Sequence, residues 1–252
     1  MISIDLKEIA ETARKTARLS EGDVVLNIGA NDGTLLGSYP YSLLRVGCEP
    51  ARNLTPYLRE VTSDVIADFW GIKTWQDLMR DTKVKVVTAI GMFYDMDDPN
   101  QFIADVAKVL DEDGLFIAQL MCLKSMLKKN DLGNICHEHL EYSYRSLKYL
   151  FESNGLEIFK VEENEINGGS YRLYARHLKK GSIEIRERCS KGDVLRFYKR
   201  IKANKRACVR LIRAETRKGK KVFAYGASTK GNTILQYYGL YATIIRGVAD
   251  KG

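Results

Sequence analysis

The sequence predicts an α/β fold: a doubly wound, mostly parallel sheet with an antiparallel edge, followed by a smaller α/β unit that is cut short. Two observations lead to this fold class. Short apolar segments alternate with amphipathic helical segments in the first half of the chain. After a long basic helical segment, the alternation starts again at residue 221. We therefore expect one domain over residues 1–178, and a long basic helix with a partial βαβ unit over 179–252.

The first domain is expected to begin with an amphipathic helix over residues 5–19. The apolar segment that follows the Glu21-Gly22 turn predicts the first strand. In chain order, strands are expected at 23–28, 43–48, 85–90 and 114–120, and further helices near 53–61, 74–81 and 99–110. Because a helix separates each strand from the next, the strands should be mostly parallel and the crossovers between them right-handed.

The second half begins with a helical pattern over residues 144–153 that stops at Asn154-Gly155. Two strands joined through a glycine turn should then form the antiparallel edge, and a long helix should precede the second unit. The expected elements are strands at 156–162 and 170–176, a helix over 193–217, a strand at 221–225, a loop over 226–231, a helix over 232–238 and a strand at 243–248.

Composition excludes several classes of protein. The chain is 45% hydrophobic and 29% charged, as folded proteins are, and no segment approaches the roughly 18–20 apolar residues of a membrane span. The N-terminus shows no cationic segment before an apolar run, so we expect no secretory signal and a cytoplasmic location. The five cysteines are odd in number and never spaced C-x-x-C, which argues against a disulfide framework or a zinc ribbon.

The net charge of +8 is unevenly distributed, because residues 176–221 hold 18 Lys/Arg and only 4 Asp/Glu. This basic stretch is explained by a solvated helix face, by an anionic ligand such as a nucleotide diphosphate, or by nucleic acid. Nucleic acid is the least favoured, since the sequence contains no aromatic stacking platform or known nucleic-acid motif. We expect a small-molecule substrate, no membrane partner, and a monomer or homodimer.

A glycine loop follows the first strand in V-V-L-N-I-G-A-N-D-G-T-L-L, residues 24–36. Gly29 and Gly33 precede a predicted helix, where backbone can approach a ligand and N–H groups are free. At the end of the second strand, Glu49 could accept both hydroxyls of a ribose. Asp68-Phe69 offers an acceptor for an exocyclic amine and a face for a purine. An adenosine-containing ligand is therefore predicted; the alternative is a tight turn beside exposed strand ends.

These three segments resemble class I S-adenosylmethionine-dependent methyltransferases, with G-A-N-D-G similar to their first motif. The resemblance implies a Rossmann-like sheet and S-adenosylmethionine as cofactor, with S-adenosylhomocysteine as product. The implied cofactor residues are Asn27, Gly29, Asn31, Asp32, Gly33, Glu49, Asp68 and Phe69. Asn27 stands where an aspartate is common, which removes one charge near the methionine part of the cofactor.

Two of the three histidines lie in N-I-C-H-E-H-L-E-Y, residues 134–142. Zinc sites use three or four protein ligands, and side chains two apart on a helix diverge, so no metal is expected. A histidine can instead remove a proton from a carbon next to a carbonyl, and a glutamate can orient the ring or the substrate. Two hydrogen-bonded loop histidines are the alternative.

Together with N-G-G-S at 167–170 and Y-G-A-S-T-K-G-N at 225–232, this segment resembles the sugar C-methyltransferases that act on nucleotide-linked 4-keto-deoxyhexoses, enzymes of deoxysugar biosynthesis. The resemblance implies that His139 is the general base, Glu138 positions the substrate and His137 supports them. Base-promoted enolate formation would then precede methyl transfer. The C-terminal loop could cradle a diphosphate. The implied substrate contacts are Cys136, Tyr142, Asn167, Gly168, Gly169, Ser170, Ser228, Thr229, Lys230 and Asn232.

Some positions depart from that family. Cys136 stands where some members carry a tyrosine, and Asp95 replaces a histidine of sugar-modifying relatives. Members usually carry an N-terminal zinc-binding module, which this sequence does not contain, and the second unit stops at residue 252. A small-molecule O- or C-methyltransferase with another acceptor therefore remains an alternative.

Overall fold

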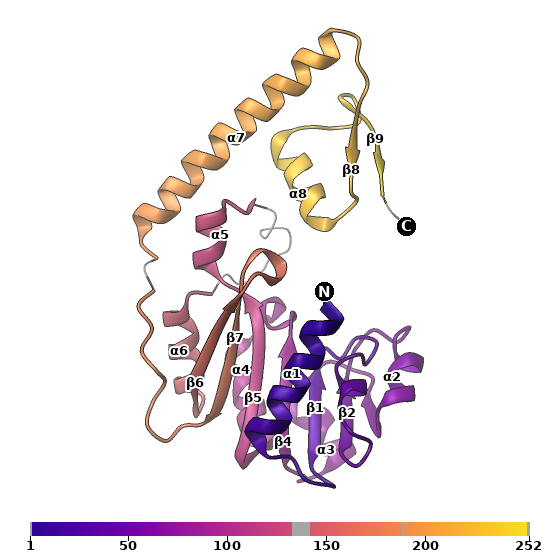
Figure 1. Cartoon of the computed structure of the whole chain (residues 1–252), viewed down its shortest axis with the longest axis vertical. Helices are drawn as coiled ribbons and strands as arrows, with labels where there is room; N and C mark the ends of the chain where they lie inside the picture. The colour runs from indigo at the N-terminus through magenta and orange to yellow at the C-terminus, as the bar shows by residue number, and fades with distance from the viewer. Residues whose placement is uncertain (1, 133–141, 188, 251–252) are drawn as a thin grey trace.

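A computed structural model describes residues 2–132, 142–187 and 189–250. Its main feature is a seven-stranded sheet, drawn in the lower part of Figure 1. The strands are β1 (Val24–Ile28), β2 (Leu44–Cys48), β3 (Asp64–Ile66), β4 (Val84–Ile90), β5 (Leu110–Met121), β6 (Leu156–Asn164) and β7 (Ser170–His177). They are ordered β3-β2-β1-β4-β5-β7-β6, and β7 alone runs in the direction opposite to the other six. The predicted fold class is confirmed.

Helices cover both faces of this sheet. They are α1 (Ile2–Ala17), α2 (Thr55–Val61), α3 (Ile72–Met79), α4 (Pro99–Val109), α5 (Leu123–Lys129) and α6 (Tyr144–Ser153), with short 3-10 turns η1 (Leu36–Ser38), η2 (Phe93–Asp95) and η4 (Ile166–Gly168). In Figure 1, α1 crosses one face of the sheet while α4 lies behind it. The helices and strands expected by residue range in the first domain are present, and β3 and α5 are additional.

The core consists of two layers because strand residues alternate between the two faces of the sheet. Leu26 and Ile28 of β1 belong to the layer that α3, α4 and α6 cover. Val25, one position before Leu26, belongs to the layer under α1, which buries Ile9 and Ala13. By the same alternation, Asn27, two positions after Val25 in β1, lies on the α1 face of the sheet. Gln119, two positions after Ile117 in β5, lies on that face too.

One expectation about the first loop is wrong. The glycine loop after β1 was expected to open a helix, but residues 29–35 continue as turns into η1, so no helix N-terminus faces the loop. Gly33 has a packing reason for being glycine: its φ is +84°, and a Cβ there would lie 2.4 Å from Cγ2 of Val61 on α2. The sequence pattern identified the glycine but not the helix that crowds it.

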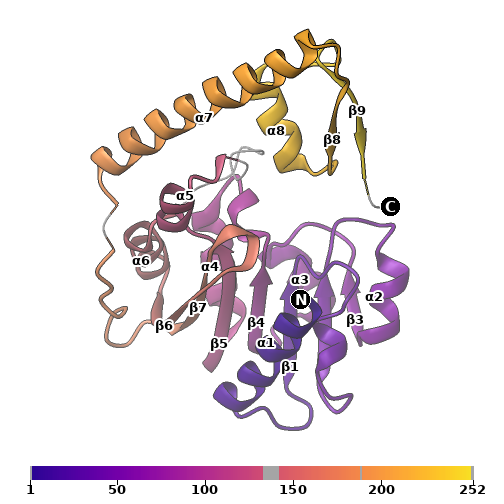
Figure 2. The same ribbon diagram turned by 45° about the horizontal axis from the view of Figure 1, so that its top comes forward.

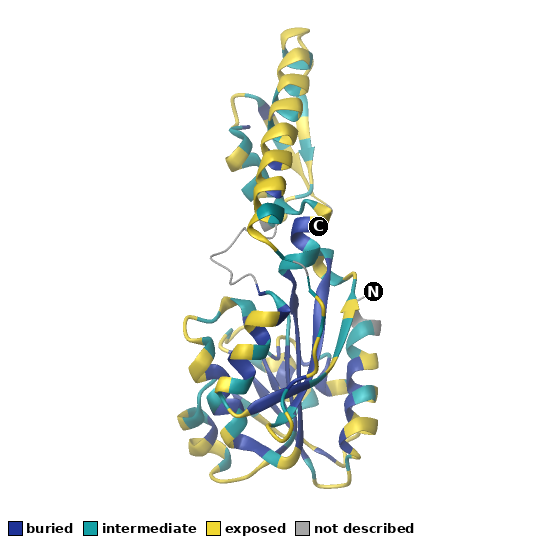
Figure 3. Cartoon of the chain, turned by 90° about the vertical axis from the view of Figure 1, so that its left-hand side faces the viewer, coloured by how far each residue is buried: buried dark blue, intermediate teal, exposed yellow. Residues whose placement is uncertain are grey.

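The C-terminal unit consists of α7 (Lys191–Arg217), β8 (Val222–Tyr225), α8 (Thr229–Tyr238) and β9 (Ile245–Ala249), with β8 and β9 parallel. Phe197 and Ile201 anchor α7 on Met126 and Leu127 of α5. Beyond that contact the helix projects from the sheet domain, and its surface is largely exposed (Figures 2 and 3). Among the described residues, no helix is long and apolar enough to cross a membrane.

Candidate functional site

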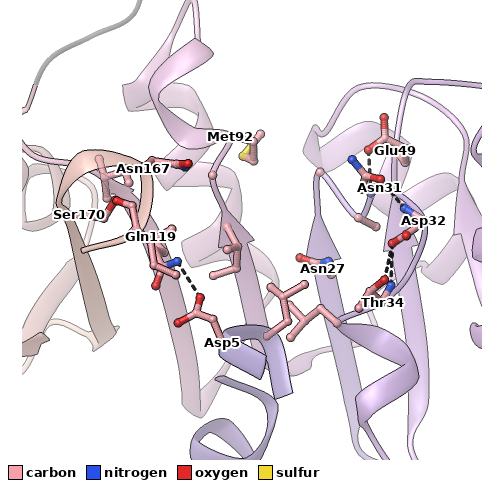
Figure 4. Close-up of a pocket in the computed structure, with 18 of the residues that line it drawn as sticks. Asp5, Asn27, Asn31, Asp32, Thr34, Glu49, Met92, Gln119, Asn167 and Ser170 are labelled. Atoms are coloured by element: carbon pink, nitrogen blue, oxygen red, sulfur yellow. Dashed lines mark hydrogen bonds between the residues drawn. The ribbon is translucent and has the colours of Figure 1, made fainter. Parts of the chain in front are cut away.

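A cavity of about 580 Å³ opens at the carboxyl ends of β1, β4 and β5. Ligand sites in open α/β sheets are found at this edge, and the volume lies within the roughly 300–1,000 Å³ of small-molecule pockets. Figure 4 shows its labelled side chains. The lining residues are Asp5, Leu6, Asn27, Gly29, Ala30, Asn31, Asp32, Thr34, Leu35, Glu49, Ile90, Gly91, Met92, Tyr94, Gln119, Leu120, Ile166, Asn167 and Ser170.

Gly29 keeps one wall of this cavity open. Its φ is +69°, a conformation that residues with a side chain rarely adopt, and a Cβ would lie 2.7 Å from Cγ of Met92. Its backbone N–H donates to the carbonyl of Cys48 at 2.9 Å, which ties the loop to the end of β2. The sequence thus provides glycine where backbone, and not a side chain, must border the cavity.

Glu49 organises the loop beside it. Its carboxylate accepts the backbone N–H of Asn31 at 2.9 Å and that of Ala51 at 2.9 Å. Asp32 accepts the backbone N–H and the hydroxyl of Thr34, and these hydrogen bonds lower the pKa of Asp32. A carboxylate has about four acceptor positions, so Glu49 retains capacity for further donors from the cavity.

Three of the predicted cofactor residues lie outside the cavity lining. Gly33 packs against α2, as described above. Asp68 and Phe69 follow β3, one strand beyond Glu49, where the Asp68 carboxylate accepts the Phe69 N–H at 2.7 Å. The Phe69 side chain is 72% exposed. A contact between Asp68-Phe69 and a purine therefore stays a prediction.

On the opposite wall, Asn167 and Ser170 line the cavity, as expected for substrate contacts. Gly168 and Gly169 do not line it. A Cβ at Gly169, whose φ is +126°, would lie 2.5 Å from the Ser125 side chain, so this glycine allows η4 to approach α5. Tyr142 is also packed rather than open, with its ring stacked on Phe93 and burial raising its pKa to about 12.

The histidine segment lies outside the described residues, and with it Cys136, His137, Glu138 and His139. Tyr142, the first described residue after it, pairs with Cys122 at the end of β5, and its carbonyl accepts the N–H of Leu123 at 3.0 Å. The chain therefore returns from this segment at the same edge of the sheet as the cavity. In the described part of the chain, no group of three metal-binding side chains is present.

The C-terminal loop approaches the same rim. Ser228 caps α8 by accepting the N–H of Gly231 at 3.1 Å, and Lys230 donates to the carbonyl of Asn167 at 3.2 Å. Thr229 begins α8, whereas Asn232 lines a separate hollow with residues of β9. Lys230 thus reaches the cavity rim from the first turn of α8.

Sequence reasoning missed the wall that α1 and β5 contribute. Asp5 on α1 and Gln119 on β5 both line the cavity and are joined by a hydrogen bond of 3.0 Å. Met92 and Tyr94, after β4, line it as well. The only sequence signal for Asp5 and for Gln119 is a polar residue in an apolar pattern.

Two sequence comparisons match this chain. Residues 165–252 match the family described as the C-methyltransferase C-terminal domain. The chain is also 29% identical, over 263 aligned residues, to C-methyltransferase NovU from Streptomyces niveus. The alignment covers 97% of this chain and 62% of that relative, so the chain spans less than two thirds of the relative's length.

Solved structures share the fold at low sequence identity. A methyltransferase from Clostridium acetobutylicum has a TM-score of 0.54 at 10% identity, covering 68% of this chain and 90% of that chain. Magnesium protoporphyrin IX methyltransferase from Synechocystis has a TM-score of 0.53 at 10% identity, covering 70% and 79%. This likeness confirms the Rossmann-like sheet. By sequence, the chain is similar to a C-methyltransferase along nearly its whole length, and its last 88 residues match the C-terminal domain of such enzymes.

Proposed function

We propose that this protein is an S-adenosylmethionine-dependent methyltransferase that methylates a carbon of a nucleotide-linked keto-deoxysugar. The observation that carries the proposal is the cavity bordered by Gly29 and Glu49, in a chain related to a C-methyltransferase over 97% of its length. The relative's name supports the C-methylation, and the sugar acceptor rests on the motifs at 134–142, 167–170 and 225–232.

The residues of the first loop fit the cofactor. Gly29 leaves backbone open to the cavity, and a Cβ at that position would close the space toward Met92. Glu49 lines the cavity with acceptor positions available for ribose hydroxyls. When bound, S-adenosylmethionine supplies an electrophilic methyl group on a positively charged sulfur. The chain's own task is to hold the acceptor carbon in line with that methyl group.

The acceptor sugar would lie against the cavity wall formed by Asn167 and Ser170. We propose that His139, in the segment that ends beside this wall at Tyr142, removes the proton from the carbon next to the keto group, with Glu138 and His137 assisting. An enolate then forms on the sugar, and its carbon takes the methyl group. Lys230 at the rim supplies a positive charge for the diphosphate, which gives the C-terminal loop its function.

The test combines binding and product analysis. Calorimetric titration of the full chain should show S-adenosylhomocysteine binding, and a thymidine or uridine diphosphate should bind as well or tighten it. Incubation with isotope-labelled S-adenosylmethionine and a nucleotide-linked 4-keto-deoxysugar should give a product with a new carbon–carbon bond by nuclear magnetic resonance. Cofactor binding without any nucleotide binding would indicate another acceptor, and absence of cofactor binding would refute the proposal.

A further inference from the structure

A cluster of charged residues lies at the cavity wall, and the proposed chemistry above does not use it. Arg172 on β7 has a side chain only 4% exposed and forms an ion pair with Asp5 on α1. Its Nε donates to Oε1 of Gln119 at 2.8 Å, and Gln119 in turn donates to Asp5 at 3.0 Å. The cluster therefore joins α1 to β5 and β7 over one end of the sheet.

The cluster carries an excess of negative charge. Besides Asp5, two further carboxylates approach the Arg172 guanidinium, Glu8 and Glu162, each at 3.7 Å. Glu162 also pairs with Lys160 at 2.7 Å, so two cations, Arg172 and Lys160, face three carboxylates. In a partly buried position such an excess favours a cation nearby, since the field there is less screened than in water.

Only part of the cluster borders the cavity. Asp5 and Gln119 line it, whereas Arg172, Glu8 and Glu162 do not. The guanidinium therefore holds the Asp5 carboxylate from behind, and Gln119 fixes its orientation. Figure 4 shows the Asp5 carboxylate beside Gln119 at the lower edge of the cavity.

Figure 4 shows the Glu49 and Asp32 carboxylates across the cavity from Asp5. Glu49 accepts the N–H groups of Asn31 and Ala51, and its remaining acceptor positions serve the ribose in the proposed function, while Asp32 accepts from Thr34. Asn27, on the same sheet face, is neutral, and its oxygen accepts the Thr88 hydroxyl at 2.9 Å. Asp5 is thus the carboxylate at the α1 end of the cavity, with the orienting contacts of a preformed binding group.

We propose that Asp5, held by Arg172 and oriented by Gln119, binds the α-ammonium group of the methionine part of the cofactor. This inference rests on the proposed function. An ammonium group offers three donors, and a charge-assisted hydrogen bond to a fixed carboxylate is the strongest single contact available to it. Asp5 acts in binding and takes no part in the methyl transfer.

The test compares two ligands that differ only in the amino-acid part. S-adenosylhomocysteine carries the α-ammonium group, whereas 5′-methylthioadenosine keeps the adenosine and the sulfur without it. Calorimetric titration of the Asp5→Asn variant should show S-adenosylhomocysteine binding weakened roughly 10- to 100-fold, the usual loss for a hydrogen bond between charged groups. Methylthioadenosine should bind as it does to the unaltered protein.

Glu8→Gln is the matched control, because Glu8 contacts the same guanidinium from outside the cavity and is 67% exposed. Its binding of both ligands should be unchanged. If Asp5→Asn binds S-adenosylhomocysteine normally, or loses both ligands equally, the ammonium contact is wrong while the proposed function stands. If the unaltered protein binds neither ligand, the proposed function fails together with this inference.

Discussion

Lys230, in the first turn of α8, donates from Nζ to the carbonyl oxygen of Asn167 across 3.2 Å. Asp131, after α5, lies 3.8 Å from the same Nζ atom. Asn167 lines the cavity, so this lysine links the C-terminal unit directly to the cavity rim. A substrate that fills the cavity and extends toward the C-terminal loop would meet the lysine charge on its way.

Replacing Lys230 by methionine should weaken acceptor binding more than cofactor binding. The variant loses one hydrogen bond and a charge at a partly exposed position, so KM for a nucleotide-linked sugar should rise roughly 3- to 10-fold. Affinity for S-adenosylhomocysteine, measured by calorimetry, should not change. Lys221→Met alters an exposed lysine of the same unit and is the control. An equal rise in KM in the control would mean that the loss of any positive charge in this unit weakens acceptor binding, and that Lys230 makes no specific contact.

Gly29→Val should abolish cofactor binding in a folded protein. The added side chain must adopt a φ of +69° and would place its Cβ 2.7 Å from Cγ of Met92, inside the cavity wall. Calorimetric titration with S-adenosylhomocysteine should show no heat of binding. Gly71→Val is the matched control, because Gly71 has an extended backbone and no atom within 4 Å of a Cβ. Normal binding by folded Gly29→Val would remove this loop from the site.

His139→Ala should abolish turnover without affecting cofactor affinity. Loss of a general base typically costs 10²- to 10⁴-fold in rate, whereas the cofactor loop is elsewhere in the chain. The rate of methyl transfer and the affinity for S-adenosylhomocysteine should be measured on one preparation. His177→Ala is the control, since His177 lies at the opposite end of β7 from the cavity, beside the carbonyl of Leu110. Full activity in His139→Ala would exclude it as the base.

Local patterns predicted six of the seven strands of the sheet because each of the six shows its burial within its own sequence, whereas the short, partly exposed β3 was missed. Val24–Ile28 is buried throughout, and its apolar run is bounded by Gly22 and Gly29. The long helix was predicted as well, but not its exposed apolar side chains. Leu211 is 65% exposed because α7 extends past the sheet domain that its first turns contact. The periodicity of apolar residues shows which face of a helix is apolar, but it does not show whether another part of the protein covers that face.

Sequence patterns predicted the cavity residues that lie in one loop or at a strand end. They missed the cavity residues that come together from distant segments of the chain. Gly29 and Glu49 lie at strand ends, which the sequence marks. Asp5 and Arg172 are 167 residues apart, and no local pattern indicates that they form an ion pair. The same limit applies to Gly33, whose need for a small residue comes from Val61 on a later helix.

Glu157 provides a test of stability against pH, at the far end of the sheet from the cavity. Its buried carboxylate accepts three backbone N–H groups of residues 179–181 and the Arg176 guanidinium at 2.8 Å. Burial alone would raise the pKa of Glu157, but the backbone donors and Arg176 outweigh it and lower the pKa to about 2 from 4.5. The folded state therefore binds this proton less readily than the unfolded chain does.

Because the pKa is depressed on folding, the contribution of Glu157 to stability is fully present well above pH 4.5 and is lost as the pH falls toward 2. Glu157→Gln should lower the free energy of unfolding at pH 7 by about 1–3 kcal/mol, since one buried acceptor is lost. Urea denaturation at pH 7 and pH 3 should show the gap between the two proteins narrowing at the lower pH. Glu184→Gln, at a carboxylate 84% exposed, should show almost no gap at either pH. A Glu157→Gln gap that stays constant from pH 7 to pH 3 would mean that the carboxylate's charge does not stabilise the β6–β7 edge.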